Sequence, residues 1–176
     1  MPAANASFNG DFGLINVYGV PKPGYRALQL MHEAGSDRVN TTSVGTGSCS
    51  DTIGVLALRN GSQMMVIVYS QVARGLPIQD SCDVTLLLNA ATRPSHSTLR
   101  RIDADHANPR KRWLELGAPQ WPSPTQNEDI LNASKMVAEP APFTAAMGAA
   151  ERGSAWSLDL KVPAQGVVGV SFTCEV

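Results

Sequence analysis

The sequence predicts a mainly β protein: a two-sheet antiparallel β-sandwich, with a strand–helix segment at its start and one short inserted helix. Two observations carry this prediction. After residue 35, short runs of residues alternate between apolar and polar with a period of two, as half-buried strands do. Turn signals separate these runs, and Asn60-Gly61 between two of them is a strong hairpin signal. Seven or eight short strands joined by turns are typical of a sandwich.

The composition is that of a globular protein with one core. The chain has 176 residues, of which 43% are hydrophobic and 16% charged, and its formal net charge is −1. We therefore expect no nucleic-acid partner, because such proteins carry a marked positive charge. We also expect no membrane partner, because no apolar run approaches the roughly 18 residues of a spanning helix. No cofactor is expected.

The first part of the chain predicts a turn and then a short strand or extended segment over residues 14–18. Pro21 and Pro23 mark the start of a helix expected over residues 23–34, and Gly35 supplies its end. An apolar stripe at helical spacing runs along it, made of Tyr25, Leu28, Leu30 and Met31.

The later elements follow from alternation and from one capping signal. The expected strands are residues 38–44, 52–59, 63–70, 82–89, 97–103, 155–162 and 167–174. Residues 64–68 are apolar on both faces, which predicts a central strand. A polar loop is expected at residues 105–109, and Ser123 with Pro124 and Gln126 predicts a capped helix start. The Ala-, Pro- and Gly-rich residues 138–153 are expected to wrap the surface.

Four glycosylation sequons favour a secretory-pathway origin, either secreted or lysosomal, and begin at Asn5, Asn40, Asn60 and Asn132. The first residues have neither the basic nor the apolar region of a signal peptide. Three cysteines allow one disulfide and one free thiol, and their spacing leaves the pairing open: Cys49, Cys82 and Cys174.

Two groups of residues are candidates for a site. Asp103, Asp105 and His106, followed by Asn108, offer ligands that a divalent cation could use, although Asp and Asn equally cap loops. We favour the structural role and predict no metal site. Trp113 and Trp121 could form an aromatic platform for a sugar, although anchoring a loop is the more common use of such rings.

Several short motifs occur in series along the chain: FNGDFGL at 8–14, GVPKP at 19–23, RID at 101–103, DHANP at 105–109 and GAP at 117–119. In this order they resemble glycoside hydrolase family 39, which contains β-xylosidases and α-L-iduronidases. The resemblance implies that residues 1–35 are a remnant of the last β/α unit of a (β/α)8 barrel. Residues 36–176 would then be the β-sandwich domain that accompanies the barrel.

The resemblance also decides what chemistry to expect. Retaining glycosidases use two carboxylates, and in the family resembled both are glutamates on barrel strands upstream of the matching part. No position of this chain matches either motif, so we predict no catalytic residue here. The expected function is that of a sandwich portion of a glycoside hydrolase, with the missing barrel in the same polypeptide as its partner. Whether the chain has enzymatic activity of its own is left open.

The barrel-end motif departs from the family pattern at two positions, with Asn9 where His is frequent and Asp11 where Gly is usual. Because loops at the carboxyl ends of barrel strands face the active site, Phe8, Asn9, Asp11 and Phe12 are candidate sugar contacts of a parent enzyme. Together with the two rings of the possible platform, Trp113 and Trp121, they are the predicted substrate-binding residues. Two alternatives remain. The chain could be a carbohydrate-binding, lectin-like module, or an interaction domain that forms a homodimer through the stripe around Leu28, Leu30 and Met31.

Overall fold

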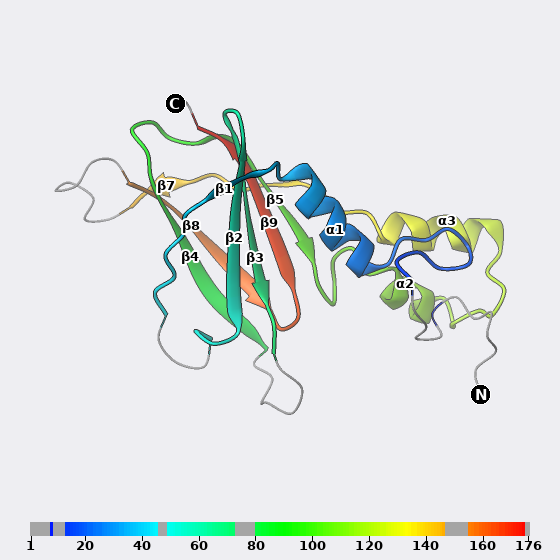
Figure 1. Cartoon of the computed structure of the whole chain (residues 1–176). Helices are drawn as coiled ribbons and strands as arrows, with labels where there is room; N and C mark the ends of the chain where they lie inside the picture. The colour runs from blue at the N-terminus through cyan, green and yellow to red at the C-terminus, as the bar shows by residue number, and fades with distance from the viewer. Residues whose placement is uncertain (1–7, 9–12, 46–48, 73–79, 147–154, 175–176) are drawn as a thin grey trace. The chain divides into compact units, whose positions relative to one another are not determined.

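The computed structural model describes residues 8, 13–45, 49–72, 80–146 and 155–174. Within these residues the chain forms two compact units, each made from two separate stretches of sequence (Figure 1). Unit 1 consists of residues 1–29 and 101–137, and unit 2 of residues 30–100 and 138–176. We describe each unit by itself.

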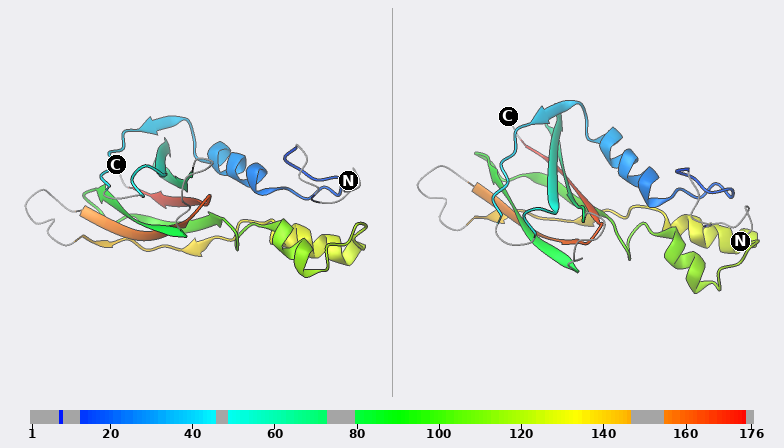
Figure 2. Two further views of the ribbon diagram at one scale, coloured as in Figure 1. Left: turned by 90° about the horizontal axis from the view of Figure 1, so that it is seen from below. Right: turned by 60° about the horizontal axis from the view of Figure 1, so that its bottom comes forward.

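Unit 2 carries the two predicted sheets. The larger sheet has the strand order β1 (Asp37–Val39), β2 (Ile53–Asn60), β3 (Gln63–Ser70), β9 (Val167–Thr173), β5 (Ser95–Ile102) and β6 (Glu139–Pro140). The smaller sheet has the order β4 (Ser81–Asn89), β8 (Ala155–Pro163) and β7 (Thr144–Ala145). Strands β4 and β8 pair antiparallel along their whole length and lie together in every view (Figures 1 and 2). The predicted mainly β, two-sheet fold is confirmed.

The core of unit 2 lies between the sheets and draws on both of them. Its buried residues come from β3, β5 and β9 of the larger sheet and from β8 of the smaller: Val68, Leu99, Val168, Val170, Phe172, Leu160 and Val162. Ala141 and Phe143 complete the cluster from the short connection between β6 and β7, where the chain passes from one sheet to the other. The expectation that residues 138–153 only wrap the surface was therefore wrong for this connection, because its apolar side chains are core residues.

The hairpin signal and the central strand are both confirmed. Strands β2 and β3 pair antiparallel around Asn60 and Gln63, which directly oppose each other across the turn. Strand β3 lies between β2 and β9, which explains why the run from Met64 to Val68 is apolar on both faces. The first expected strand, in contrast, is short, since only Asp37–Val39 pair with β2 and the following residues are exposed coil.

Helix α1 (Pro23–Glu33) forms where the proline pair and the apolar stripe predict it. Its stripe is not uniform. Leu30 is fully buried, and the backbone of Gly169 lies so close that a Cβ there would come within 2.9 Å of the Leu30 Cδ2 atom. Leu28 and Met31 are close to half-exposed. Leu30 is therefore a packing residue of the sandwich and is withdrawn from the surface we expected to dimerise.

The segment before α1 has less strand than expected. Among its described residues, Ile15 forms a single bridge with Pro21, and the chain turns back between them. The Asn16 side chain causes this turn, because its Oδ1 atom accepts hydrogen bonds from the backbone N–H groups of Tyr18 at 3.0 Å and Val20 at 2.9 Å. An Asn side chain that satisfies its own backbone competes with strand pairing, and here it closes a compact loop.

Glycine is required at position 35, directly after α1. Gly35 has φ +87°, and a Cβ there would lie 2.8 Å from the carbonyl oxygen of Arg59. We expect Gly35→Ala to lower the free energy of unfolding by about 2–3 kcal/mol, combining a left-handed backbone with a collision. Gly61→Ala is the matched control, because Gly61 has φ +61° and open space around it, so about 1 kcal/mol is expected. If urea unfolding shows equal losses of stability in Gly35→Ala and Gly61→Ala, the proposed collision with the Arg59 carbonyl oxygen is wrong.

Candidate functional site

Of the two helices in residues 101–137, the sequence predicted one and missed the other. Helix α3 (Pro124–Ala133) begins with the expected capping box, in which the Ser123 side chain accepts from the Gln126 N–H and the Gln126 side chain accepts from the Ser123 N–H. Helix α2 (Pro109–Glu115) was missed. The signal was present, since Asn108 is its N-cap and Pro109 occupies the first helical position, where a missing N–H costs nothing.

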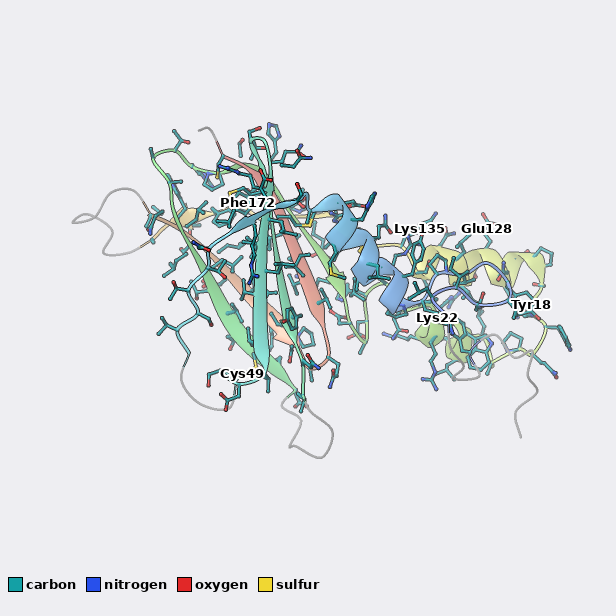
Figure 3. All side chains as sticks on the ribbon, viewed as in Figure 1. Tyr18, Lys22, Cys49, Glu128, Lys135 and Phe172 are labelled. Carbon is teal, nitrogen blue, oxygen red and sulfur yellow. A yellow bond between two sulfur atoms is a disulfide. The ribbon has the colours of Figure 1, made fainter. Side chains whose placement is uncertain are left out.

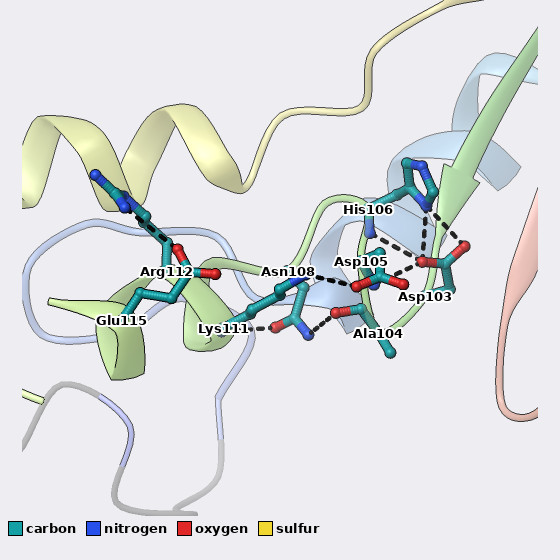
Figure 4. A network of polar contacts seen from close by, with 8 residues as sticks. All are labelled: Asp103, Ala104, Asp105, His106, Asn108, Lys111, Arg112 and Glu115. Atoms are coloured by element: carbon teal, nitrogen blue, oxygen red, sulfur yellow. Dashed lines mark hydrogen bonds and ion pairs between the residues drawn. The ribbon is translucent and has the colours of Figure 1, made fainter. Parts of the chain in front are cut away.

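The loop between β5 and α2 is ordered by one nearly buried carboxylate (Figure 4). The Asp103 side chain is 4% exposed and accepts hydrogen bonds from the backbone N–H groups of Asp105 at 2.8 Å and His106 at 2.9 Å. The His106 ring also contacts it through Nδ1, 2.8 Å from Oδ1. A carboxylate accepts hydrogen bonds, so Nδ1 is the donor and Nε2 is the nitrogen left for other partners.

Asn108 connects this loop to α2. Its Oδ1 atom accepts from the Lys111 backbone N–H at 3.2 Å, while its Nδ2 atom donates to the Ala104 carbonyl at 2.9 Å. Ala107, between these residues, has φ +51°, a left-handed conformation that the surrounding hydrogen bonds hold in place. The polar motif therefore builds a rigid loop that ends in a helix.

An open cleft of about 300 Å³ lies beside this loop, and all of its lining residues belong to unit 1. Its charged lining includes both signs: Arg101, Asp105, Lys111, Arg112, Glu115 and Lys135. Lys111 forms an ion pair with Asp105, and Arg112 donates to Glu115 at 3.2 Å. Arg112 also reaches Asp129 on α3 at 3.2 Å and so joins the two helices. Sequence reasoning missed this contact, because nothing in the spacing of Arg112 and Asp129 indicates that they meet.

The metal candidates do not converge on one point. Both oxygens of Asp103 contact His106, whereas the carboxylate of Asp105 pairs with Lys111. Among the residues that the structure describes, no group of three or more His, Cys, Asp or Glu side chains is arranged to hold a metal ion. The bonds that Asp103 accepts from the Asp105 and His106 N–H groups are of the loop-capping kind favoured from the sequence, whereas Asp105 pairs with a lysine side chain. The absence of a metal site stays a prediction.

The aromatic candidates differ from each other. The Trp113 ring packs against Phe8, with centroids 5.5 Å apart and planes tilted by 52°, and its indole N–H donates to the Pro119 carbonyl at 3.0 Å. Trp113 thus anchors the connection between α2 and α3. Trp121 is 65% exposed. Asn9, Asp11 and Phe12 lie outside the described residues, and the predicted sugar contacts stay predictions.

The two cysteines nearest in sequence form the disulfide, Cys49 to Cys82, with Cα atoms 5.9 Å apart. It ties the turn before β2 to the start of β4, and therefore joins chain segments that lead into different sheets. Cys174 is the free thiol, and partial burial raises its pKa. Within the described part of the chain, no helix has the length and apolar character needed to cross a membrane.

Comparison with known proteins identifies the family. The sequence profile of the glycosyl hydrolases family 39 matches residues 2–151. The chain belongs to this family. It is 30% identical over 132 residues to a curated "Beta-xylosidase" of Caldicellulosiruptor saccharolyticus, an alignment that covers 75% of this chain and 26% of that protein. The family resemblance seen in the sequence motifs is confirmed.

Solved structures of family 39 share the fold. The enzyme from Xanthomonas axonopodis pv. citri superposes with a TM-score of 0.70 at 17% identity, covering 97% of this chain and 34% of that chain. A monomeric beta-xylosidase from Caulobacter crescentus CB15 gives 0.68 at 18% identity, covering 98% and 34%. The family 39 chain described here thus spans about a quarter of the curated relative and about a third of each solved chain.

One carboxylate in the cleft of this family 39 chain, that of Asp105, has a lowered pKa. The hydrogen bond and positive charge of Lys111 lower the pKa of Asp105, and Asp105 in turn raises the pKa of Lys111. A glycosidase general acid needs the opposite, a raised carboxyl pKa, in order to carry a proton near neutral pH. The geometry of Asp105 therefore suits an ion pair and not proton donation.

Replacing Lys111 by alanine should return the pKa of Asp105 toward its ordinary value. A carboxyl whose pKa is lowered by folding contributes stability above its unfolded pKa, and that contribution disappears as the pH falls through the folded pKa. The carboxyl signal of Asp105 in an NMR titration measures the change directly. Lys135→Ala is the control, because the Lys135 ammonium donates to Asn132. An unchanged Asp105 titration in Lys111→Ala would show that the ion pair does not form in solution.

Removing the Asp103 carboxylate should loosen the loop. We expect Asp103→Ala to lower the free energy of unfolding by about 1–3 kcal/mol, because the N–H groups of Asp105 and His106 lose their acceptor. Hydrogen exchange of these two amides should accelerate. Asp105→Ala is the control, since its side chain is 70% exposed and little change in stability is expected. Similar losses in both variants would show that burial of Asp103 does not matter.

Proposed function

We propose that this chain is the sandwich-bearing, C-terminal part of a β-xylosidase-like glycosidase, and that the catalytic carboxylates are supplied by a barrel in the same polypeptide. The observation that carries the proposal is the 30% identity to a β-xylosidase of which the chain covers 26%. In this proposal, residues 1–35 are the end of the barrel. The sandwich supports the barrel, and hydrogen bonds within unit 1 order the loop from Asp103 to Asn108.

The carboxylates of the polar cleft support the non-catalytic part of the proposal. Asp105 pairs with Lys111, and Glu115 with Arg112. The lowered pKa of Asp105 keeps that carboxylate from carrying the proton that glycosidic bond cleavage draws from its general acid. We do not favour the homodimer alternative. The Caulobacter relative is described as a monomeric beta-xylosidase, and Leu30 of the expected stripe is buried and so unavailable to a second copy.

A secretory-pathway location belongs to the same proposal. Disulfides persist in oxidising compartments, and the Cys49–Cys82 pair fits that setting. The described sequon asparagines Asn40, Asn60 and Asn132 are all exposed. If glycans are attached, treatment with an amide-cleaving glycosidase should lower the mass of the native protein and convert each occupied Asn to Asp. An unchanged mass would remove the glycoprotein assignment.

Two assays test the proposed function. An antibody to this chain should detect a native protein larger by most of a barrel of about 250 residues. The immunoprecipitate should hydrolyse an aryl β-xyloside, whereas the purified 176-residue chain should not. Hydrolysis by the purified chain would contradict the non-catalytic role. Binding of xylo-oligosaccharides by the purified chain, lost in Trp121→Ala, would favour the lectin-like alternative.

A further inference from the structure

A hollow beside the β2–β3 turn includes one of the sequon asparagines in its lining. Asn60, the last residue of β2, lines an open hollow of about 130 Å³. All of the lining residues belong to unit 2, and they come from the end of α1 and from β2, β3, β5 and β9. Asn60 is exposed, and so are Gly61 and Ser62, the other two residues of its sequon. A glycan on Asn60 would therefore begin at this hollow.

The strand register decides which side chains face the hollow. Phe172, labelled in Figure 3, is a core residue of the sandwich, so Ser171 and Thr173 beside it on β9 point to the opposite, outer face of the sheet. Across the β3–β9 pair, Met65 opposes Ser171 and Gln63 opposes Thr173. Directly opposed residues share a face. The four side chains therefore lie together on the outer face of the larger sheet.

The end of α1 bounds the hollow on another side. Ala34 is buried, and a Cβ at the next residue, Gly35, would lie 2.8 Å from the Cβ of Asn60. Glu33 also lines the hollow and forms an ion pair with Arg100 of β5. These contacts hold the end of α1 close to the hairpin, so the hollow is a preformed feature of unit 2.

The lining has the chemistry that a sugar ring needs. A sugar ring presents apolar C–H groups on its faces and hydroxyl groups around its edge. The hollow offers apolar side chains in Ala34 and Met65, and it offers hydrogen-bonding side chains in Gln63, His96 and Thr173. A mostly apolar surface with a few polar groups is the usual composition of a site for a small organic ligand.

The small volume of the hollow favours an attached sugar over a free one. Pockets that bind free ligands usually measure about 300–1,000 Å³, whereas this hollow measures about 130 Å³. A free ligand must overcome the loss of translational and rotational freedom, and few contacts do not suffice for that. A glycan bonded to a lining residue is already held at a high effective concentration, so few contacts are enough to order it.

The other described sequons lack this combination of features. Asn40 lies in exposed coil and is not among the lining residues of the hollow. Asn132 lines the polar cleft of unit 1, but it lies within α3, and Ser134 of its sequon is fully buried with its hydroxyl bonded to the Leu131 carbonyl. Glycosylation sequons are used in surface loops, and the Ser or Thr is part of the signal. The exposed hairpin turn at Asn60 meets both conditions.

We propose that Asn60 carries an N-linked glycan whose first sugar lies in this hollow and stabilises unit 2. The inference rests on the proposed secretory-pathway location, to which it adds one modified residue and a structural role for its glycan. In the attachment step, Asn60 Nδ2 forms a bond to the anomeric carbon of a lipid-diphosphate-linked oligosaccharide. The bond from that carbon to the diphosphate oxygen breaks, the lipid diphosphate leaves with the electron pair, and Nδ2 loses one proton to a base of the cell's transferase.

Enzymatic release of the glycan tests whether the sugar lies in the hollow. The chain is secreted from eukaryotic cells behind a signal peptide, and glycopeptide mass spectrometry should find Asn60 occupied. An amide-cleaving glycosidase should release this glycan at least about tenfold more slowly from the folded chain than from the urea-denatured chain, because the linkage is reached only when the sugar leaves the hollow. A glycan on Asn40, in exposed coil, is the matched control and should show less than about a twofold difference.

Sequon variants test the structural role of the glycan. Ser62→Ala removes the sequon but leaves Asn60 in place, and it should lower the urea midpoint of the secreted chain. Thr42→Ala removes the sequon at Asn40 and should leave the midpoint unchanged. Export to the bacterial periplasm supplies the chain without glycans under oxidising conditions, and there Ser62→Ala and the wild type should have equal midpoints.

A contact variant separates the hollow from general effects of a bulky glycan. Thr173→Val removes one hydroxyl from the lining and should lower the midpoint of the glycosylated chain more than that of the Ser62→Ala chain. The difference between the two effects isolates the contact of Thr173 with the sugar. Equal effects in both backgrounds would show that the sugar does not contact this side of the hollow and would overturn the proposed placement.

The outcomes separate this inference from the proposed function. An unmodified Asn60 beside a glycosylated Asn40 overturns the inference and leaves the secretory-pathway location standing. Release from Asn60 as fast as from Asn40, or equal midpoints of the secreted wild type and Ser62→Ala, also overturns it. A native protein without any glycan overturns the secretory-pathway location and the inference together, whereas a native protein no larger than this chain overturns only the proposed glycosidase function.

Discussion

Replacing Phe143 by alanine should lower the free energy of unfolding by about 3–5 kcal/mol, the largest loss expected for a single substitution in this chain. Phe143 is 1% exposed and meets the Phe172 ring edge-on, with centroids 5.0 Å apart. It lies between β6 and β7, on the connection that joins the two sheets. Alanine would leave a cavity at the contact between the sheets, where the flanking strands cannot collapse to fill it.

Urea unfolding, followed by tryptophan fluorescence, measures this loss. Phe143→Leu keeps most of the volume, and about half of the destabilisation of Phe143→Ala is expected. Leu87→Ala removes an equally apolar side chain from an exposed position of β4, and a change within about 0.5 kcal/mol is expected. A Phe143→Ala loss no larger than that of Leu87→Ala would show that this connection does not belong to the core.

Removing the Cys49–Cys82 disulfide should cost about 4 kcal/mol. The crosslink spans a sequence separation of 33 residues, and the loss of chain entropy in the unfolded state for a loop of this size gives that figure. The double variant Cys49→Ser and Cys82→Ser should therefore unfold at a clearly lower urea concentration. Reducing agent should shift the wild-type chain to the same midpoint and should leave the double variant unchanged.

Cys174→Ser supplies the control for this experiment. Cys174 is the free thiol of the described residues, so its replacement should leave the sensitivity to reducing agent intact. If reducing agent lowers the stability of the double variant as much as that of the wild-type chain, the crosslink formed in solution is not the Cys49–Cys82 pair.

Local sequence signals predicted those elements whose cause is local. The capping box at Ser123 and the Asn60-Gly61 turn depend on residues within four positions of each other, and both were found where expected. Strand β3 was recognised as central because burial on both faces leaves a continuous apolar run. Helix α2 was missed because its seven residues hold too few turns for a periodic pattern.

Contacts between residues far apart in the chain could not be predicted from the sequence. The bonds from Arg26 to Ser134 cross 108 positions, and no pattern in either segment indicates a partner. The pairing of Cys49 with Cys82 needed the Cα separation of 5.9 Å, which spacing alone does not supply. The polar loop was located correctly from its residues, but only the burial of Asp103 shows which carboxylate orders it.

The position of β9 has a consequence for biosynthesis. This strand lies between β3 and β5 in the larger sheet, so β1, β2 and β3 remain separated from β5 and β6 until residues 167–173 have been made. Synthesis from the N-terminus therefore exposes two open sheet edges until residues 167–173 have left the ribosome, and open edges invite pairing with other chains. Premature termination before residue 167 would leave both edges permanently unpaired, and such products should be directed to aggregation or degradation.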